Sequence, residues 1–167
     1  MSIQIKDFGK TTAGQPVKVG ILANDTIEVH ILSYGATIQQ LLVPDRKGNK
    51  VDVVLGYPTV QDYELNTCFL GAVVGRYANR IGGSKFTLYE EEYHVTPNEG
   101  KNCLHSGLHG FNHTLFDVAL TPGETDSVTM TALRKPMWNC WPMVLRMVPT
   151  SSVQKRPCAM APSASMP

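Results

Sequence analysis

The sequence predicts an all-β protein, an antiparallel β-sandwich formed by one domain. Three observations favour this fold class. Short segments rich in β-branched residues show a rough alternation of apolar and polar side chains. Turn-forming pairs such as Asn24-Asp25 and Gly82-Gly83 separate these segments. No window of about ten or more residues has a convincing helical period, and regularly spaced strands and turns are typical of antiparallel sandwiches.

The expected elements follow one another with short connections. A polar stretch at 45–50 (DRKGNK) predicts a solvated hairpin turn, because its charges and glycine suit an exposed loop. The one helical candidate covers residues 59–65 (TVQDYEL). The expected strands are residues 17–22, 26–32, 36–43, 50–55, 69–74, 85–89 and 92–96.

The composition argues against several classes of protein. The chain has 167 residues, of which 43% are hydrophobic and 17% charged, as in a globular domain. A net charge of +1 gives no electrostatic reason to expect a nucleic acid or a membrane surface as a partner. No apolar stretch reaches the roughly eighteen residues of a transmembrane helix, and we expect no signal peptide. The four cysteines form no CxxC pair, so we expect reduced thiols and a cytoplasmic protein.

The character of the chain changes at about residue 133. Residues 134–167 contain both tryptophans, five of the seven methionines and several prolines, but no acidic residue. They show neither alternation nor a helical period, and proline interrupts a strand ladder. We therefore expect a structured domain over 1–133 and a disordered tail over 134–167. A frame-shifted or alternatively spliced end would produce such a break, and a genuine disordered C-terminus is the alternative.

Polar side chains that suit a ligand site occur in two glycine-flanked segments. The segment 71–81 (GAVVGRYANRI) begins like a buried strand and then carries Arg76, Asn79 and Arg80. Unpaired buried charges are costly, so such groups pair with each other or hold a ligand. The segment 104–111 (LHSGLHGF) places His105 near glycines, where the backbone can approach a bound molecule closely. Guanidinium, amide and imidazole groups together suit a hydroxyl-rich ligand.

These two segments resemble a known family. The run GRYANRI at 75–81 is followed by N-x-G-x-N-x-LH-x-G-x-x-GF at 98–111, and this order is similar to aldose 1-epimerase, also called galactose mutarotase. The run SYGA at 33–36 leading to Pro44-Asp45, and the run DVVLGY at 52–57 leading to Tyr63, fit the same family. The resemblance covers residues 1–133 and implies the N-terminal part of a mutarotase-like β-sandwich, incomplete in this chain and followed by a tail over 134–167 that is not homologous to the family.

The resemblance also implies the site residues. Asn79, Arg80 and His105 are expected to hold sugar hydroxyls, and Arg76 is a further candidate. For an arginine the structural alternative is an ion pair that joins two sheets, and Arg76 fits that role equally well. For His105 the alternative is a core histidine bonded to a backbone carbonyl, although its imidazole could also move a proton near neutral pH.

No metal and no organic cofactor is expected. His105, His109 and His113 are four residues apart, the spacing that aligns metal ligands on a helix. Gly107 and Gly110 argue against that helix, and no cysteine or carboxylate nearby completes a tetrahedral set.

The activity implied by the resemblance is the interconversion of the α and β anomers of a hexose such as galactose or glucose. A base removes the proton of the anomeric hydroxyl while an acid protonates the ring oxygen, and the opened ring closes on its other face. The family's acid is a histidine in an N-H-x-Y-F-N-L type motif, and its base is a glutamate near the C-terminus. Neither motif occurs in this sequence, so no catalytic residue is assigned. The expected partner is a small aldohexose; a carbohydrate-binding remnant without turnover and a non-functional truncated product are the alternatives.

Overall fold

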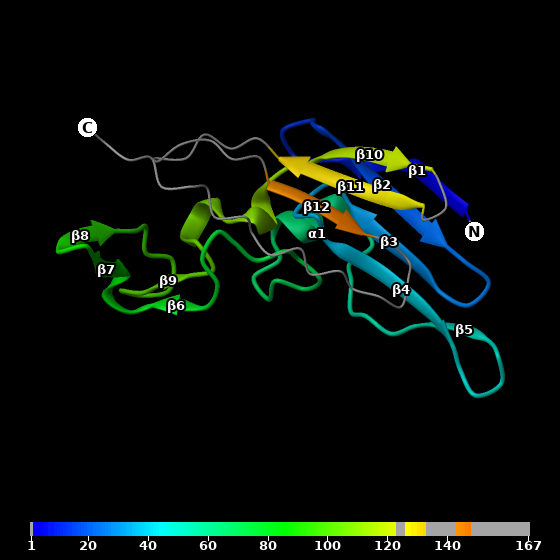
Figure 1. Ribbon diagram of the computed structural model, residues 1–167, viewed down its shortest axis with the longest axis horizontal. Coiled ribbons are helices and arrows are strands. Elements are labelled where there is room, and N and C mark those ends of the chain that lie inside the picture. Colours follow the sequence, from blue (N-terminus) through cyan, green and yellow to red (C-terminus); the bar gives the residue numbers. More distant parts are fainter. Residues whose placement is uncertain (1, 123–125, 133–142, 148–167) are drawn as a thin grey trace, which may run out of the picture.

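The strands form two sheets and two short strand pairs. The computed structural model describes residues 2–122, 126–132 and 143–147, and every strand pairing within them is antiparallel (Figure 1). The five-stranded sheet has the order β1-β2-β3-β4-β5, with bounds Ser2–Lys10, Pro16–Ala23, Glu28–Leu32, Ile38–Pro44 and Lys50–Asp52. The three-stranded sheet has the order β10-β11-β12, with bounds Asp117–Thr121, Ser127–Ala132 and Met143–Met147. The two pairs are β6 (Arg80–Ile81) with β9 (Cys103–Leu104), and β7 (Lys85–Leu88) with β8 (Glu91–His94).

One core lies between the two sheets. Leu22 of β2 and Ile31 of β3 pack against Val128 and Met130 of β11, and all four side chains are almost completely buried. Phe111 and Phe116 close the same cluster with their rings 6.2 Å apart. Burial of apolar surface between two antiparallel sheets makes this part of the molecule a β-sandwich.

The sheets approach so closely that one position between them tolerates only glycine. A Cβ atom on Gly20 of β2 would lie 2.9 Å from Cγ1 of Val128, which is fully buried. Valine is branched at Cβ and has little rotamer freedom with which to move away. Gly20 therefore sets the spacing between β2 and β11.

The opposite face of the five-stranded sheet holds a second cluster. Val17, Val19 and Ile21 of β2 contact Val60 and Tyr63 of the short helix α1 (Val60–Glu64). Thr59 caps this helix, because its side chain accepts a hydrogen bond from the backbone N–H of Asp62. Both faces of β2 are thus covered, which explains why its sequence is a nearly continuous apolar run. No helix in the described part of the chain is long and apolar enough to cross a bilayer.

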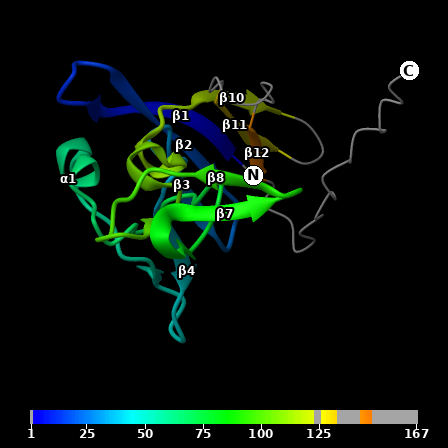
Figure 2. The same ribbon diagram turned by 90° about the vertical axis from the view of Figure 1, so that its left-hand side faces the viewer.

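The strand pairs β6–β9 and β7–β8 lie together at one end of the molecule, away from the two sheets (Figure 1). Figure 2 looks onto this end and shows β7 and β8 in front of the sheets. The hairpin β7–β8 is exposed along most of its length. Its largest internal contact is Phe86 stacked on Tyr93, with ring centroids 5.5 Å apart.

The all-β antiparallel prediction is confirmed, and so is the helix expected at 59–65, which forms as α1. The strand expected at 69–74 is wrong. Phe69 and Gly71 have φ angles of 56° and 65°, and the N–H of Ala72 donates to the carbonyl of Phe69 across a turn. Left-handed residues two positions apart prevent the extended backbone that a strand requires. The turn formed by this apolar run lies against β4, because the N–H of Ile38 donates to the carbonyl of Gly71.

Six of the strands in the described residues were not expected from the sequence: β1, β6, β9, β10, β11 and β12. β12 (Met143–Met147) falls within the segment expected to be a disordered tail, and it pairs with β11 over five residues. The rest of 134–167 lies outside the described residues, so the domain boundary at 133 stays a prediction.

Replacement of Gly20 by alanine tests the spacing of the sheets. We expect Gly20→Ala to lower the free energy of unfolding by about 1–3 kcal/mol, because the added methyl group overpacks the core against Val128. Gly82→Ala is the matched control, since no atom lies within 4 Å of the Cβ position there. Chemical denaturation of both variants measures the difference, and equal losses in the two would contradict the proposed contact.

Candidate functional site

A two-residue ladder brings the predicted site residues together. In the pair β6–β9, Arg80 lies opposite Leu104 and Ile81 lies opposite Cys103. The residues just outside the ladder continue the contact: His105 N–H donates to the carbonyl of Asn79, and Asn79 N–H donates to Nδ1 of His105, both at 3.0 Å. Asn79, Arg80 and His105 therefore form one cluster, as expected from the two sequence segments.

The imidazole of His105 has a defined tautomer in this arrangement. Because Nδ1 accepts a hydrogen bond from a backbone N–H, the neutral ring carries its proton on Nε2. Nε2 has no partner among the residues that the structure describes, so it is a donor available to a ligand. The ring is half-buried and packs edge-on against Phe69, with centroids 4.8 Å apart. The ring of His105 is thus not bonded to a backbone carbonyl, unlike the core histidine that was the structural alternative.

The backbone at this cluster is held in an uncommon conformation. Asn79, His105 and Ser106 have φ angles of 60°, 50° and 73°, in the left-handed region that favours glycine. Such residues cost on the order of 1–3 kcal/mol each and persist only where surrounding contacts enforce them. Left-handed backbone thus occurs on both segments of the cluster.

Two side chains supply the contacts that enforce this geometry. The amide of Asn98 pairs with both backbone groups of Leu104, donating to its carbonyl at 3.0 Å and accepting from its N–H at 2.6 Å. The hydroxyl of Ser106 does the same for Tyr77, accepting from its N–H at 2.8 Å and donating to its carbonyl at 2.9 Å. These side chains replace the strand partners that a ladder of two residues lacks.

Arg80 is exposed and paired with Glu99. Its Nε and Nη2 groups donate to the two carboxylate oxygens of Glu99 at 2.5 and 2.6 Å. The hydrogen bonds and positive charge of Arg80 lower the pKa of the Glu99 carboxyl below its ordinary value of 4.5. The same pair raises the pKa of the Arg80 guanidinium. Arg76 and Arg80 both face solvent, so neither is a buried charge.

Arg76 is not part of this cluster. Its guanidinium carbon lies 5.6 Å from the centroid of the Phe111 ring, a cation–π distance. Gly75 permits this approach, because a Cβ there would lie 2.5 Å from the same ring. Within the described part of the chain, Arg76 makes no hydrogen bond or ion pair with Asn79, Arg80 or His105. The contact with Phe111 is a cation–π contact and not the ion pair between two sheets named as the structural alternative, and a binding role of Arg76 stays a prediction.

The sequence reasoning missed Glu99 and the clamping roles of Asn98 and Ser106. The available signal was the run N-E-G-K-N at 98–102, directly before β9. A turn there folds the chain back, with reciprocal backbone hydrogen bonds between Glu99 and Asn102 of 3.1 and 2.9 Å. This turn places the carboxylate of Glu99 beside a guanidinium that lies 19 residues earlier.

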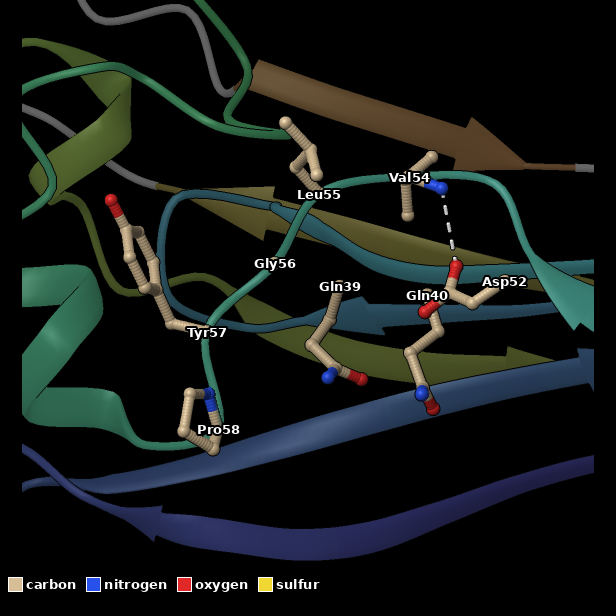
Figure 3. Close-up of a pocket in the computed structure, with 8 residues that line it drawn as sticks. All are labelled: Gln39, Gln40, Asp52, Val54, Leu55, Gly56, Tyr57 and Pro58. Carbon is tan, nitrogen blue, oxygen red and sulfur yellow. Dashed lines mark hydrogen bonds between the residues drawn. The ribbon is translucent and has the colours of Figure 1, made fainter.

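A separate cavity of about 360 Å³ lies at the end of β4, as Figure 3 shows. It is lined by Gln39, Gln40, Asp52, Val54, Leu55, Gly56, Tyr57 and Pro58. Its charged residue, Asp52, accepts hydrogen bonds from the N–H groups of Leu41 and Val54 and so holds the end of its own strand. None of the predicted site residues lines this cavity.

The described residues contain no group of three or more histidine, cysteine, aspartate or glutamate side chains that could hold a metal ion. His109 ends one 3-10 turn (Gly107–His109) and His113 ends another (Phe111–His113), and Gly110 separates the two. The regular spacing of the histidines therefore does not place them on one helix.

The fold and the cluster define a class of protein: a β-sandwich that presents amide, guanidinium and imidazole donors on a rigid, solvent-facing turn. The chain belongs to the aldose 1-epimerase family, because the family model described as aldose 1-epimerase matches residues 19–157.

Individual relatives agree with this assignment. Galactose mutarotase from Sus scrofa is 45% identical over 117 residues, which are 70% of this chain and 34% of that protein. Galactose mutarotase from Homo sapiens is 40% identical over 110 residues, covering 65% of this chain and 32% of that protein. The aldose 1-epimerase of Streptococcus thermophilus is 36% identical over 110 residues, which are 66% of this chain and 32% of that protein. The chain thus spans about a third of the length of these relatives.

Two solved structures share the fold. The galactose 1-epimerase of Lactobacillus acidophilus NCFM superposes with a TM-score of 0.68 at 23% identity, over 81% of this chain and 39% of that one. The GalM/aldose epimerase homologue from C. elegans superposes with a TM-score of 0.60 at 33% identity, over 69% of this chain and 36% of that one. The overall fold is thus shared with these two solved structures.

Titration of Glu99 tests its pairing with Arg80. We expect Arg80→Gln to raise the pKa of the Glu99 carboxyl towards its ordinary value of 4.5, because the hydrogen bonds and the positive charge are lost together. A carboxyl with a lowered pKa stabilises the folded chain above its unfolded-state pKa, and this contribution disappears as the pH falls through the folded-state pKa. Carbon-detected NMR of the Glu99 side chain measures the shift. Arg76→Gln is the control, and an equal effect of the two substitutions would disprove the pairing.

Proposed function

We propose that this chain binds an aldohexose at Asn79, Arg80 and His105, and that it forms the sugar-binding part of an aldose 1-epimerase that interconverts the α and β anomers of hexoses such as galactose and glucose. The observation that carries the proposal is the reciprocal hydrogen bonding between Asn79 and His105, which fixes both residues at one solvent-facing place. Family membership supports the kind of ligand, because the relatives are named galactose mutarotase and aldose 1-epimerase.

The groups available in the cluster suit a sugar. A pyranose presents several neighbouring hydroxyls, each of which both donates and accepts hydrogen bonds. The side-chain amide of Asn79 offers both functions, the outer edge of the Arg80 guanidinium offers donors, and His105 offers the Nε2 proton. Because the backbone is already ordered by Asn98 and Ser106, little conformational entropy would be lost on binding.

The reaction itself needs an acid and a base. Each positioned group contributes typically about 10²–10⁴-fold to the rate. The N-H-x-Y-F-N-L type motif and the late glutamate that the family resemblance implies do not occur in the 167 residues. Binding without turnover is therefore the second candidate function, and we assign no catalytic residue. In either case we propose a cytoplasmic role in hexose metabolism, with the free sugar as partner and without nucleic acid, membrane or cofactor.

Sugar titration tests the binding proposal. We expect His105→Ala and Asn79→Ala each to weaken binding of D-galactose about three- to tenfold, the effect of losing one net hydrogen bond. His94→Ala is the matched control, because His94 is an exposed histidine on the hairpin β7–β8, ion-paired with Glu92. Ligand-observed NMR or calorimetry measures the affinities. Unchanged affinity in both site variants would rule out this site.

Polarimetry of freshly dissolved α-D-galactose separates the two candidate functions. Acceleration of the optical change over buffer indicates an epimerase, whereas binding with no acceleration indicates the carbohydrate-binding function alone. Absence of both binding and acceleration would contradict the proposed function.

A further inference from the structure

The carboxylate of Glu99 has no assigned role, and it lies against the one arginine of the cluster. We propose that Glu99 is a positioning and specificity-determining residue. Its carboxylate holds one edge of the Arg80 guanidinium and neutralises its charge. Arg80 then binds uncharged hydroxyls and disfavours anionic ligands. This inference rests on the proposed sugar-binding function and adds a residue and a ligand preference to it.

The geometry of the pair shows which part of Arg80 remains available. Glu99 occupies the side edge of the guanidinium, formed by Nε and Nη2, at 2.5 and 2.6 Å. Both N–H groups of Nη1 and the second N–H of Nη2 point away from the carboxylate, because a planar guanidinium has five donors in a fixed fork. One N–H of Nη1 donates to Oδ1 of Asn79 at 3.5 Å, a long hydrogen bond. The free edge of Arg80, meaning the edge that Glu99 does not occupy, thus lies beside the Asn79 side chain.

A closed set of contacts fixes the relative position of the two residues. Arg80 lies opposite Leu104 in the ladder, and the amide of Asn98 holds both backbone groups of Leu104. Glu99 follows Asn98 directly and is tied to Asn102 by two backbone hydrogen bonds. The turn that carries Glu99 is therefore attached to β9, the strand that pairs with β6. From this turn the carboxylate of Glu99 reaches Arg80 of β6. Such preorganisation lets a bidentate pair persist at a surface where a single pair of long side chains would gain little.

The charge of the pair determines what the free edge attracts. An unpaired guanidinium binds carboxylate and phosphate groups bidentately and strongly. With Glu99 in place the two side chains are neutral together, and a second anion at the free edge would lie near a carboxylate. The field of Glu99 therefore opposes a phosphorylated or acidic sugar while leaving hydrogen bonds to uncharged hydroxyls available.

Substitution of Glu99 by glutamine tests the role of its charge with little change in shape. We expect the wild-type chain to bind D-galactose more tightly than D-galacturonate. In Glu99→Gln this ratio should fall by about three- to tenfold, as expected for removing one charge near a solvent-exposed anion. The difference should diminish at high salt, because mobile ions screen charges at the surface. Calorimetry at low and high salt measures both ratios.

Two further variants serve as controls. Glu92→Gln removes the same charge from the remote hairpin β7–β8, where Glu92 pairs with Lys85, and it should leave the ratio unchanged. Glu99→Asp keeps the charge on a shorter side chain and should keep most of the preference for the neutral sugar. If Glu99→Gln alters the binding of both sugars equally, or if Glu92→Gln has the same effect, the proposed role of Glu99 is overturned.

Inorganic phosphate provides a test that does not depend on sugar binding. We expect phosphate to shift the NMR signal of the Arg80 Nε–H group at several-fold lower concentration in Glu99→Gln than in the wild type. If this contrast appears but neither sugar binds to the wild type, the proposed function fails while the effect of Glu99 on Arg80 is supported. If galactose binds and no contrast appears with either phosphate or galacturonate, the role of Glu99 is overturned and the proposed function remains.

Discussion

The short ladder between β6 and β9 is the interaction on which the arrangement of the candidate site depends. It joins two segments whose key residues, Asn79 and His105, are 26 positions apart in the chain. Two residues in each strand provide too few backbone hydrogen bonds to be stable alone, since even an isolated hairpin is marginal in water. The side chains of Asn98 and Ser106 add four hydrogen bonds to backbone groups beside the ladder. The polar residues of the two segments thus fall into two groups. Asn98 and Ser106 stabilise the backbone around the ladder, whereas the side chains of Asn79, Arg80 and His105 are held there facing solvent.

A hydrogen bond to Phe111 ties the segment that precedes the ladder to the main core. Phe111 belongs to the cluster between the two sheets, and its backbone N–H donates to the carbonyl of Gly75 at 3.0 Å. Gly75 begins the segment that leads to Asn79 and Arg80, and it has no side chain because the Phe111 ring occupies that space. A change in the packing between β2, β3 and β11 would therefore reach the site through Phe111.

The part of the fold that could be predicted from the sequence is the part in which local pattern and tertiary environment agree. The segments at 17–22 and 26–32 are rich in β-branched residues and form β2 and β3. The apolar run at 69–74 has the same local character, but the left-handed backbone at Phe69 and Gly71 turns it into a loop. Nothing in the composition of a short apolar run distinguishes a strand from a buried turn. β12 illustrates the opposite error, because pairing with β11 forms a strand in a segment without an alternating pattern.

The sequence by itself determined the all-β class, the family and the presence of an amide, a guanidinium and an imidazole in two glycine-flanked segments. Residue types and their spacing along the chain are sufficient for these conclusions, since they do not depend on contacts between distant residues. Only the tertiary structure decided that Arg76 lies on the ring of Phe111 while Arg80 pairs with Glu99. Two arginines four positions apart carry the same charge and the same donors, so their partners follow from which segments the fold brings beside them. The tautomer of His105 was decided in the same way, by the backbone N–H of Asn79, which lies 26 residues earlier in the sequence.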